Sequence, residues 1–154
     1  MNARKFVGIV VVVFSLVAMA AFAQQGQMKD MKMEDHKEHN AMMQECAKAC
    51  SDCQRACDTC ATHCAHMMAE GKKEHLETLM ACRDCATICS ACSEICSRGG
   101  PFANLIAEAC AKACSDCATA CEKFSDDKAM KACAEECRKC EKACQAMVKA
   151  MSGK

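Results

Sequence analysis

Apolar and polar residues follow a helical period through most of the chain. In four segments a cysteine recurs at steps of three and four residues, and the positions between are mainly Lys, Glu, Asp, Ala and Ser. Such steps place residues on one face of an α-helix, so each segment is predicted to be an amphipathic helix with an inward stripe. The stripes are Cys46, Cys50, Cys53, Cys57, Cys60 and Cys64; Cys82, Cys85, Cys89, Cys92 and Cys96; Cys110, Cys114, Cys117 and Cys121; and Cys133, Cys137, Cys140 and Cys144.

Helix-breaking residues separate these four segments. Asn40 is a good N-cap for the first, and Gly71 follows it. Residues 97–101 (Ser-Arg-Gly-Gly-Pro) and 125–127 (Ser-Asp-Asp) are typical of turns. Because short connections favour antiparallel neighbours, residues 41–154 are predicted to form an all-α, antiparallel up-down-up-down four-helix bundle with a cysteine-lined core.

An internal repeat supports this topology. Residues 47–53 read Ala-Lys-Ala-Cys-Ser-Asp-Cys, and residues 111–117 have the identical sequence. The first and third helices are therefore predicted to be copies, as expected if a helical hairpin was duplicated.

The first 23 residues differ from the rest of the chain. A basic start, residues 1–5, precedes an apolar segment over residues 6–22, and residues 21–23 (Ala-Phe-Ala) fit a signal-peptidase site. Residues 1–23 are predicted to be a secretory signal peptide, which implies an exported, periplasmic protein with no membrane contact after cleavage. The alternative is an uncleaved membrane anchor, for which the apolar segment is at the short limit.

Residues 24–40 form a polar tract that lacks an apolar helical face. The tract is predicted to be disordered. The methionines and histidines scattered through it are Met28, Met31, Met33, His36 and His39.

Charge and composition exclude two classes of function. The chain has 20 basic and 20 acidic residues, no basic stripe, and neither Trp nor Tyr, so nucleic-acid binding has no electrostatic or stacking support. A ferritin-like di-iron enzyme needs Glu-x-x-His pairs, and no histidine here has a glutamate three residues before it. The chain is predicted not to be an enzyme.

The 19 cysteines need a use other than packing. As small hydrophobes they would bury less apolar area than the Leu, Ile and Val of ordinary bundle cores. Export permits disulfides, but the number of cysteines is odd, and each helix carries more cysteines than disulfide bonds between helices would require. An exported, disulfide-stabilised structural or interaction protein stays as an alternative.

Soft metal ions are the use that fits best. Thiolates favour Cu(I), Zn(II) or iron–sulfur clusters, and the stripes lack the oxygen ligands of hard ions. If each Cu(I) takes two thiolates and each thiolate bridges two ions, a one-to-one core is neutral. Zn(II) prefers four thiolates and leaves negative charge that is costly to bury. The stripes therefore predict many Cu(I) ions per chain, with a Zn-binding thiolate bundle as an alternative.

Methionines continue the stripes toward the bundle ends. Met43 and Met67 are in register with the first stripe, and Met130, Met147 and Met151 with the fourth. Thioethers are also soft ligands. An apolar complement to the thiols is expected from Leu76, Leu79, Ile88, Ile95, Leu105 and Ile106.

One end of the bundle is predicted to admit copper. In an antiparallel arrangement, the end of the first stripe, the start of the second and the start of the fourth meet there. The candidate mouth ligands are His63, His66, Met67, His75 and Met130.

The cysteine stepping over residues 41–151 resembles that of the bacterial four-helix-bundle copper storage proteins. The resemblance implies Cu(I) bound along the bundle interior by the nineteen stripe cysteines, largely between pairs of thiolates, and assembly into homotetramers. Exported members of the family are associated with twin-arginine export, whereas residues 1–23 contain no consecutive arginines.

Overall fold

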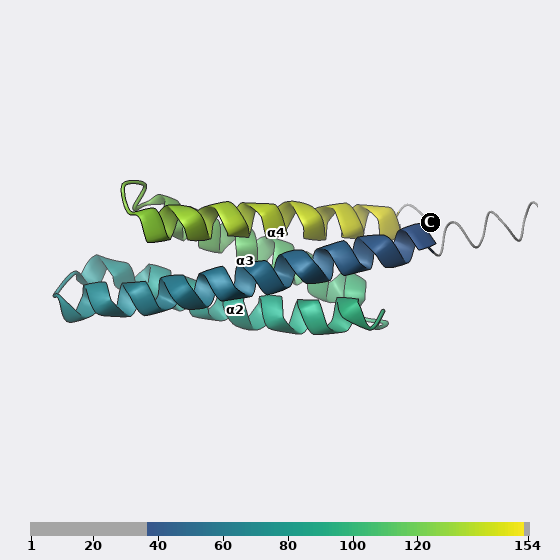
Figure 1. Ribbon diagram of the computed structural model, residues 1–154, viewed down its shortest axis with the longest axis horizontal. Coiled ribbons are helices and arrows are strands. Elements are labelled where there is room, and N and C mark those ends of the chain that lie inside the picture. The colour runs from purple at the N-terminus through teal and green to yellow at the C-terminus, as the bar shows by residue number, and fades with distance from the viewer. Residues whose placement is uncertain (1–36, 153–154) are drawn as a thin grey trace, which may run out of the picture. The chain divides into compact units, whose positions relative to one another are not determined.

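Four helices, joined by short connections, make up the part of the chain that the computed structural model describes, residues 37–152. The first is helical over residues 37–69. A 3-10 turn, η1 (Lys73–His75), then leads into α2 (Leu76–Ser97), α3 (Ala103–Glu122) and α4 (Lys128–Ser152) (Figure 1). The predicted signal peptide and most of the predicted Met/His tract lie outside the described residues.

Contacts between cysteine sulfurs establish the direction of each helix. Along the first helix and α3 the residue numbers rise together, from Cys50–Cys110 to Cys60–Cys121, so these helices run parallel. Along the first helix and α4 the order is reversed, and α2 is antiparallel to α3, against which it packs. The predicted up-down-up-down bundle is confirmed.

The helix ends show how local sequence sets the connections. Gly71 takes a positive φ of 91° after the first helix, a conformation that glycine adopts without steric cost. Asp127, in the predicted turn, caps α4, because its carboxylate accepts hydrogen bonds from the N–H groups of Ala129 and Met130. Among the described residues, no helix is long and apolar enough to cross a membrane.

The start of the first helix differs from the prediction. Residues 37–40 are already helical, so Asn40 lies inside the helix and does not cap it. Its side chain is exposed, and the propensity cost of an exposed asparagine is a fraction of a kcal/mol, about 0.7 at most.

Thiols and small side chains fill the core. Every stripe cysteine is buried, together with alanines such as Ala103 and Ala107 and the methionines Met43, Met130 and Met147. Part of the predicted apolar complement is wrong: Leu76 is 46% exposed and Leu105 is 65% exposed. Both lie off the buried face of their helices: Leu76 directly follows the buried His75, and Leu105 lies midway between the buried Ala103 and Ala107. Leu79, Ile88, Ile95 and Ile106 pack against the core from its edge.

Candidate metal centre

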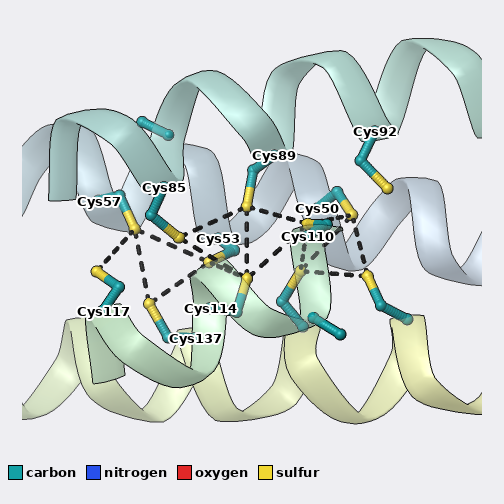
Figure 2. Packing of buried hydrophobic residues seen from close by; sticks show 14 of the residues in the cluster. Cys50, Cys53, Cys57, Cys85, Cys89, Cys92, Cys110, Cys114, Cys117 and Cys137 are labelled. Atoms are coloured by element: carbon teal, nitrogen blue, oxygen red, sulfur yellow. Dashed lines mark hydrogen bonds between the residues drawn. The ribbon is translucent and has the colours of Figure 1, made fainter. Parts of the chain in front are cut away.

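All nineteen cysteines lie in the described residues as free thiols, and none is more than 1% exposed. Because each stripe occupies one helix face, the four helices turn their thiols toward a common axis (Figure 2). The core is thus a column of sulfur atoms that water does not reach. The geometry fits the prediction of an inward cysteine stripe on each helix.

Pairs of thiols from the first helix and α3 form a ladder across this column. The Sγ–Sγ distances are 3.7 Å for Cys50–Cys110, 3.8 Å for Cys53–Cys114, 3.9 Å for Cys57–Cys117 and 3.9 Å for Cys60–Cys121. The regular spacing follows from alternating steps of three and four residues on two parallel helices.

Thiols from α2 and α4 close the ladder into four-sulfur clusters. In each cluster, one helix supplies two cysteines four residues apart and two other helices supply one each, with all four sulfurs within 4.8 Å of one another. Five such clusters are Cys46, Cys50, Cys92 and Cys144; Cys50, Cys110, Cys140 and Cys144; Cys53, Cys85, Cys89 and Cys114; Cys53, Cys57, Cys85 and Cys137; and Cys57, Cys117, Cys133 and Cys137.

Proton sharing controls the charge of this column. A hydrogen bond with Cys144 lowers the pKa of Cys46 to about 5, and hydrogen bonds with Cys110 and its neighbours raise the pKa of Cys50. Burial raises the pKa of Cys64 to about 12. Where one sulfur carries charge, its neighbour keeps a proton and donates it. Full ionisation therefore requires cations inside the column to replace the protons.

Buried methionines terminate the column at both ends. The Cys60 thiol donates to the thioether sulfur of Met130 at 3.4 Å, and the Cys96 thiol donates to that of Met147 at 3.8 Å. Met43 is also buried, whereas Met67 and Met151 are half-buried. The stripes thus end in soft sulfur donors.

Most of the predicted mouth residues gather at the Met130 end. Met67 and His75 line a cavity of about 330 Å³ together with Phe124 and Asp127. His75 is only 4% exposed and stacks on Phe124 with ring centroids 4.1 Å apart, so it is a packed histidine and not a solvated one.

The two remaining histidines of the predicted mouth lie differently. The Nε2 atom of His63 is 2.7 Å from a carboxylate oxygen of Asp127, which links the first helix to the start of α4. His66 is exposed on the first helix and does not line the cavity.

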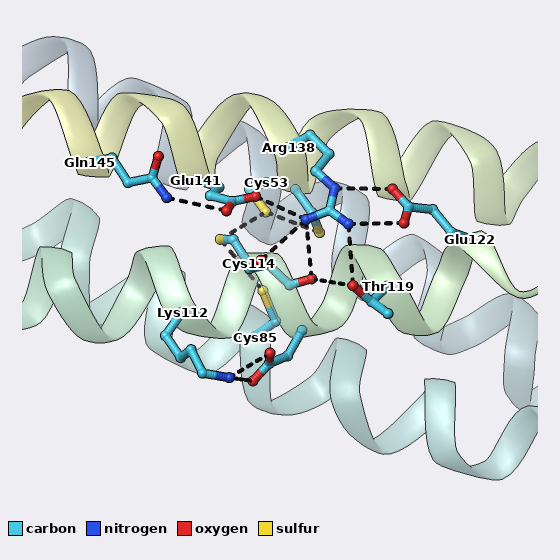
Figure 3. A network of polar contacts seen from close by, with 12 residues as sticks. Cys53, Cys85, Lys112, Cys114, Thr119, Glu122, Arg138, Glu141 and Gln145 are labelled. Atoms are coloured by element: carbon cyan, nitrogen blue, oxygen red, sulfur yellow. Dashed lines mark hydrogen bonds and ion pairs between the residues drawn. The ribbon is translucent and has the colours of Figure 1, made fainter.

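Sequence reasoning missed a polar clamp between α3 and α4. The Arg138 guanidinium makes two hydrogen bonds to Glu122, at 3.0 and 2.9 Å, and a third to Glu141 at 3.0 Å (Figure 3). It also donates to Ser115 and Thr119. Two-point recognition of a carboxylate fixes the distance between two helices. Of these contacts, only the Arg138–Glu141 ion pair, three residues apart on one helix, could be recognised from the sequence.

Comparisons with known proteins agree with the chemistry of this column. The family model described as "Copper storage protein" matches residues 27–149. The chain is 27% identical to the cytosolic copper storage protein of Streptomyces lividans in a structure of copper loading with five coppers, with a TM-score of 0.68, covering 73% of this chain and 97% of that one. No curated protein sequence matches the chain.

Two further solved structures are similar. The Cu(I)-bound copper storage protein BsCsp3 is 32% identical, with a TM-score of 0.62, covering 67% of this chain and 94% of that one. The Streptomyces lividans protein loaded with 10 copper equivalents is 28% identical, with a TM-score of 0.66, covering 71% of this chain and 86% of that one.

Proposed function

The chain belongs to the copper storage protein family, and from this premise we propose that it is an exported protein that holds about one Cu(I) per core cysteine, on the order of 19 per chain. The family stores copper and is not enzymatic. The observation that carries the proposal is an unbroken column of sulfur contacts. It runs along the first helix from Cys46 to Cys60, and each of these contacts joins a first-helix thiol to a thiol on α3 or α4. The proposed ligands are the nineteen stripe cysteines.

Neutrality supports Cu(I) as the stored ion. A thiolate that bridges two Cu(I) ions, each bound to two thiolates, gives a column with equal numbers of negative and positive charges. Burying such a column avoids the penalty of an uncompensated interior charge. The core holds no buried lysine or arginine that could balance excess thiolate among the described residues.

An anaerobic Cu(I) titration of the reduced mature chain, against a chromophoric chelator, tests the capacity. Saturation on the order of 19 equivalents is expected for one ion per bridging thiolate. Saturation at four or fewer would reject storage and indicate a single discrete site. Thiol counting after mild reduction addresses the disulfide-stabilised alternative. In that alternative most of the cysteines are held in disulfide bonds and do not react with a thiol reagent, whereas a storage protein should show nearly all nineteen as free thiols.

Export is proposed on the sequence of residues 1–23 alone. Fractionation of cells that express the full chain should release it with the periplasm, and its N-terminus should begin at Gln24. A protein that retains Met1 and stays with the cytoplasmic fraction would contradict export. That result would leave the storage proposal intact.

The family resemblance supports a homotetramer as the assembly. Light scattering coupled to size-exclusion chromatography measures the mass directly. A monomeric mass across the accessible concentration range would contradict assembly.

The Met130 end of the column is the proposed entrance for copper. Met67 and His75 line its cavity, and Met130 contacts the first-helix stripe at Cys60. Soft thioether and imidazole ligands at the end of a thiolate column can pass Cu(I) inward without releasing it to water.

A further inference from the structure

Three of the four-sulfur clusters share no thiol with one another. We name them layer 1 (Cys50, Cys110, Cys140 and Cys144), layer 2 (Cys53, Cys85, Cys89 and Cys114) and layer 3 (Cys57, Cys117, Cys133 and Cys137). Each layer takes one thiol from the first helix, one from α3, and a pair four residues apart from α4, α2 and α4 in turn. All three can therefore be occupied at once.

The sulfur separations match a tetrahedral ion. Zn(II) binds thiolates at about 2.3 Å, so the six edges of a regular tetrathiolate site are about 3.8 Å long. In layer 2, the Cys114 sulfur lies 3.8 Å from Cys53, 3.8 Å from Cys85 and 3.6 Å from Cys89, and Cys85 lies 3.9 Å from Cys89. Little movement is needed to place an ion at the centre of that layer.

Layer 1 has the same dimensions. The Cys50 sulfur lies 3.7 Å from Cys110, 3.7 Å from Cys144 and 3.6 Å from Cys140. Cys140 is 4.0 Å from both Cys110 and Cys144. In layer 3, Cys57 lies 3.6 Å from Cys137 and 3.9 Å from both Cys117 and Cys133.

We propose that, without copper, each layer binds one divalent, thiophilic, tetrahedral ion of the Zn(II) class, at least three per chain. Binding replaces four thiol protons with one ion and releases those protons to solvent. This site class goes beyond copper storage and does not depend on it.

Charge sets the order of affinity between the two kinds of ion. Four thiolates around a divalent ion leave a net charge of about −2 in each layer, whereas bridged Cu(I) thiolate is neutral. Cu(I) should therefore displace the divalent ions. The thiolates would then pass directly from the divalent ion to Cu(I), without a metal-free state in which they could be oxidised.

An anaerobic Co(II) titration of the reduced mature chain tests the proposal. Tetrahedral Co(II) tetrathiolate has intense visible d–d bands and near-ultraviolet sulfur-to-metal charge-transfer bands, which six-coordinate Co(II) in water lacks. The bands are expected to grow to three or more equivalents and to disappear as Cu(I) is added. Saturation below three equivalents, or the weak spectrum of six-coordinate Co(II), would overturn the proposal. Neither outcome depends on how many Cu(I) ions the chain stores.

Two variants that each lose one thiol locate the sites. Cys114→Ala removes a ligand from layer 2 and should lower Co(II) saturation by one equivalent, and Cys85→Ala should do the same. The matched control Cys64→Ala removes a buried thiol that belongs to none of the three layers and should keep the full count. Circular dichroism verifies that each variant is helical. Equal losses in Cys114→Ala and Cys64→Ala would reject the assignment to layers.

Discussion

The Cys60 thiol donates a hydrogen bond to the thioether sulfur of Met130 at 3.4 Å, although the residues are 70 positions apart in the chain. This contact joins the last third of the first stripe to the first turn of α4. It extends the column of thiols into a thioether at the end where Met67 and His75 line a cavity. A route for copper along sulfur donors therefore reaches the end of the bundle.

Replacing the soft ligands at this end should slow copper loading and preserve capacity. In the triple variant Met67→Leu, His75→Phe and Met130→Leu, the stripe cysteines remain, so the final Cu(I) count should match that of the native chain. The relay at the entrance is lost, and the loading rate measured by stopped flow should fall. Unchanged loading would reject this entrance and point to the end that contains Met43 and Met147.

Replacing interior thiols should have the opposite effect. Cys57→Ala with Cys89→Ala removes two ligands whose sulfurs contact thiols on α3 and α4. The Cu(I) capacity should fall by about two equivalents, since each bridging thiolate accounts for about one ion. Chelator titration gives the count, and stopped-flow loading of the same variant should stay near the native rate. A native capacity would mean that these two sulfurs are not ligands.

Removing all metal should leave a helical bundle of lower stability. Alanine and lysine are good helix formers, and the buried alanines and methionines complete the core without copper. An ion that binds only the folded bundle must raise its melting temperature. Circular dichroism should show helix without copper and a higher melting temperature with it. A random-coil spectrum of the reduced, metal-free chain would contradict this expectation.

Asp127 should stabilise the bundle through two separate contacts. One carboxylate oxygen caps α4 and the other contacts His63 on the first helix. Asp127→Ala loses both contacts and should cost about 1–2 kcal/mol of unfolding free energy. Asp127→Asn keeps a capping oxygen and should lose less. Urea denaturation compares the variants, and equal losses would show that the His63 contact, and not the cap, carries the effect.

Alkaline pH should destabilise the metal-free bundle through Cys64. Burial raises the pKa of this thiol from 9.0 to about 12. The unfolded chain releases the proton near the lower value and the folded chain near the higher one. The stabilisation is thus fully present below pH 9 and is lost as pH rises through about 12.

Anaerobic urea denaturation across that range measures the effect. Between the two pKa values, unfolding releases the Cys64 proton, so Cys64→Ala should reduce the slope of unfolding free energy against pH by the amount that corresponds to about one proton. The control is Cys46→Ala: hydrogen bonds with Cys144 and Cys50 lower the pKa of Cys46 to about 5, so its contribution is lost as pH falls. That variant should keep the native alkaline slope. An unchanged slope in Cys64→Ala would contradict the assignment.

The sequence by itself determined the helices and the faces they bury. Steps of three and four residues admit only a helical stripe, and the thiol content of the stripes, such as Cys46 to Cys64, selects a soft ion whatever the details of packing. Gly71 and Asp127 could be recognised as helix-ending and helix-starting residues because those roles depend on local backbone geometry.

Only the tertiary structure decided which thiols meet. The stripe spacing is the same on all four helices, so the sequence is equally consistent with several registers, and connection lengths do not distinguish them. Packing fixed Cys50 opposite Cys110 and Cys53 opposite Cys114, and with them the four-sulfur layers.

The same holds for side chains whose environment comes from distant segments. His75 is buried because Phe124, from the connection after α3, stacks on it. Leu105 is exposed, although its apolar side chain predicts a core position. Arg138 pairs with Glu122 across two helices. Contacts between residues far apart in the chain depend on the rotation and offset of whole helices, and those are set by the summed packing of the core.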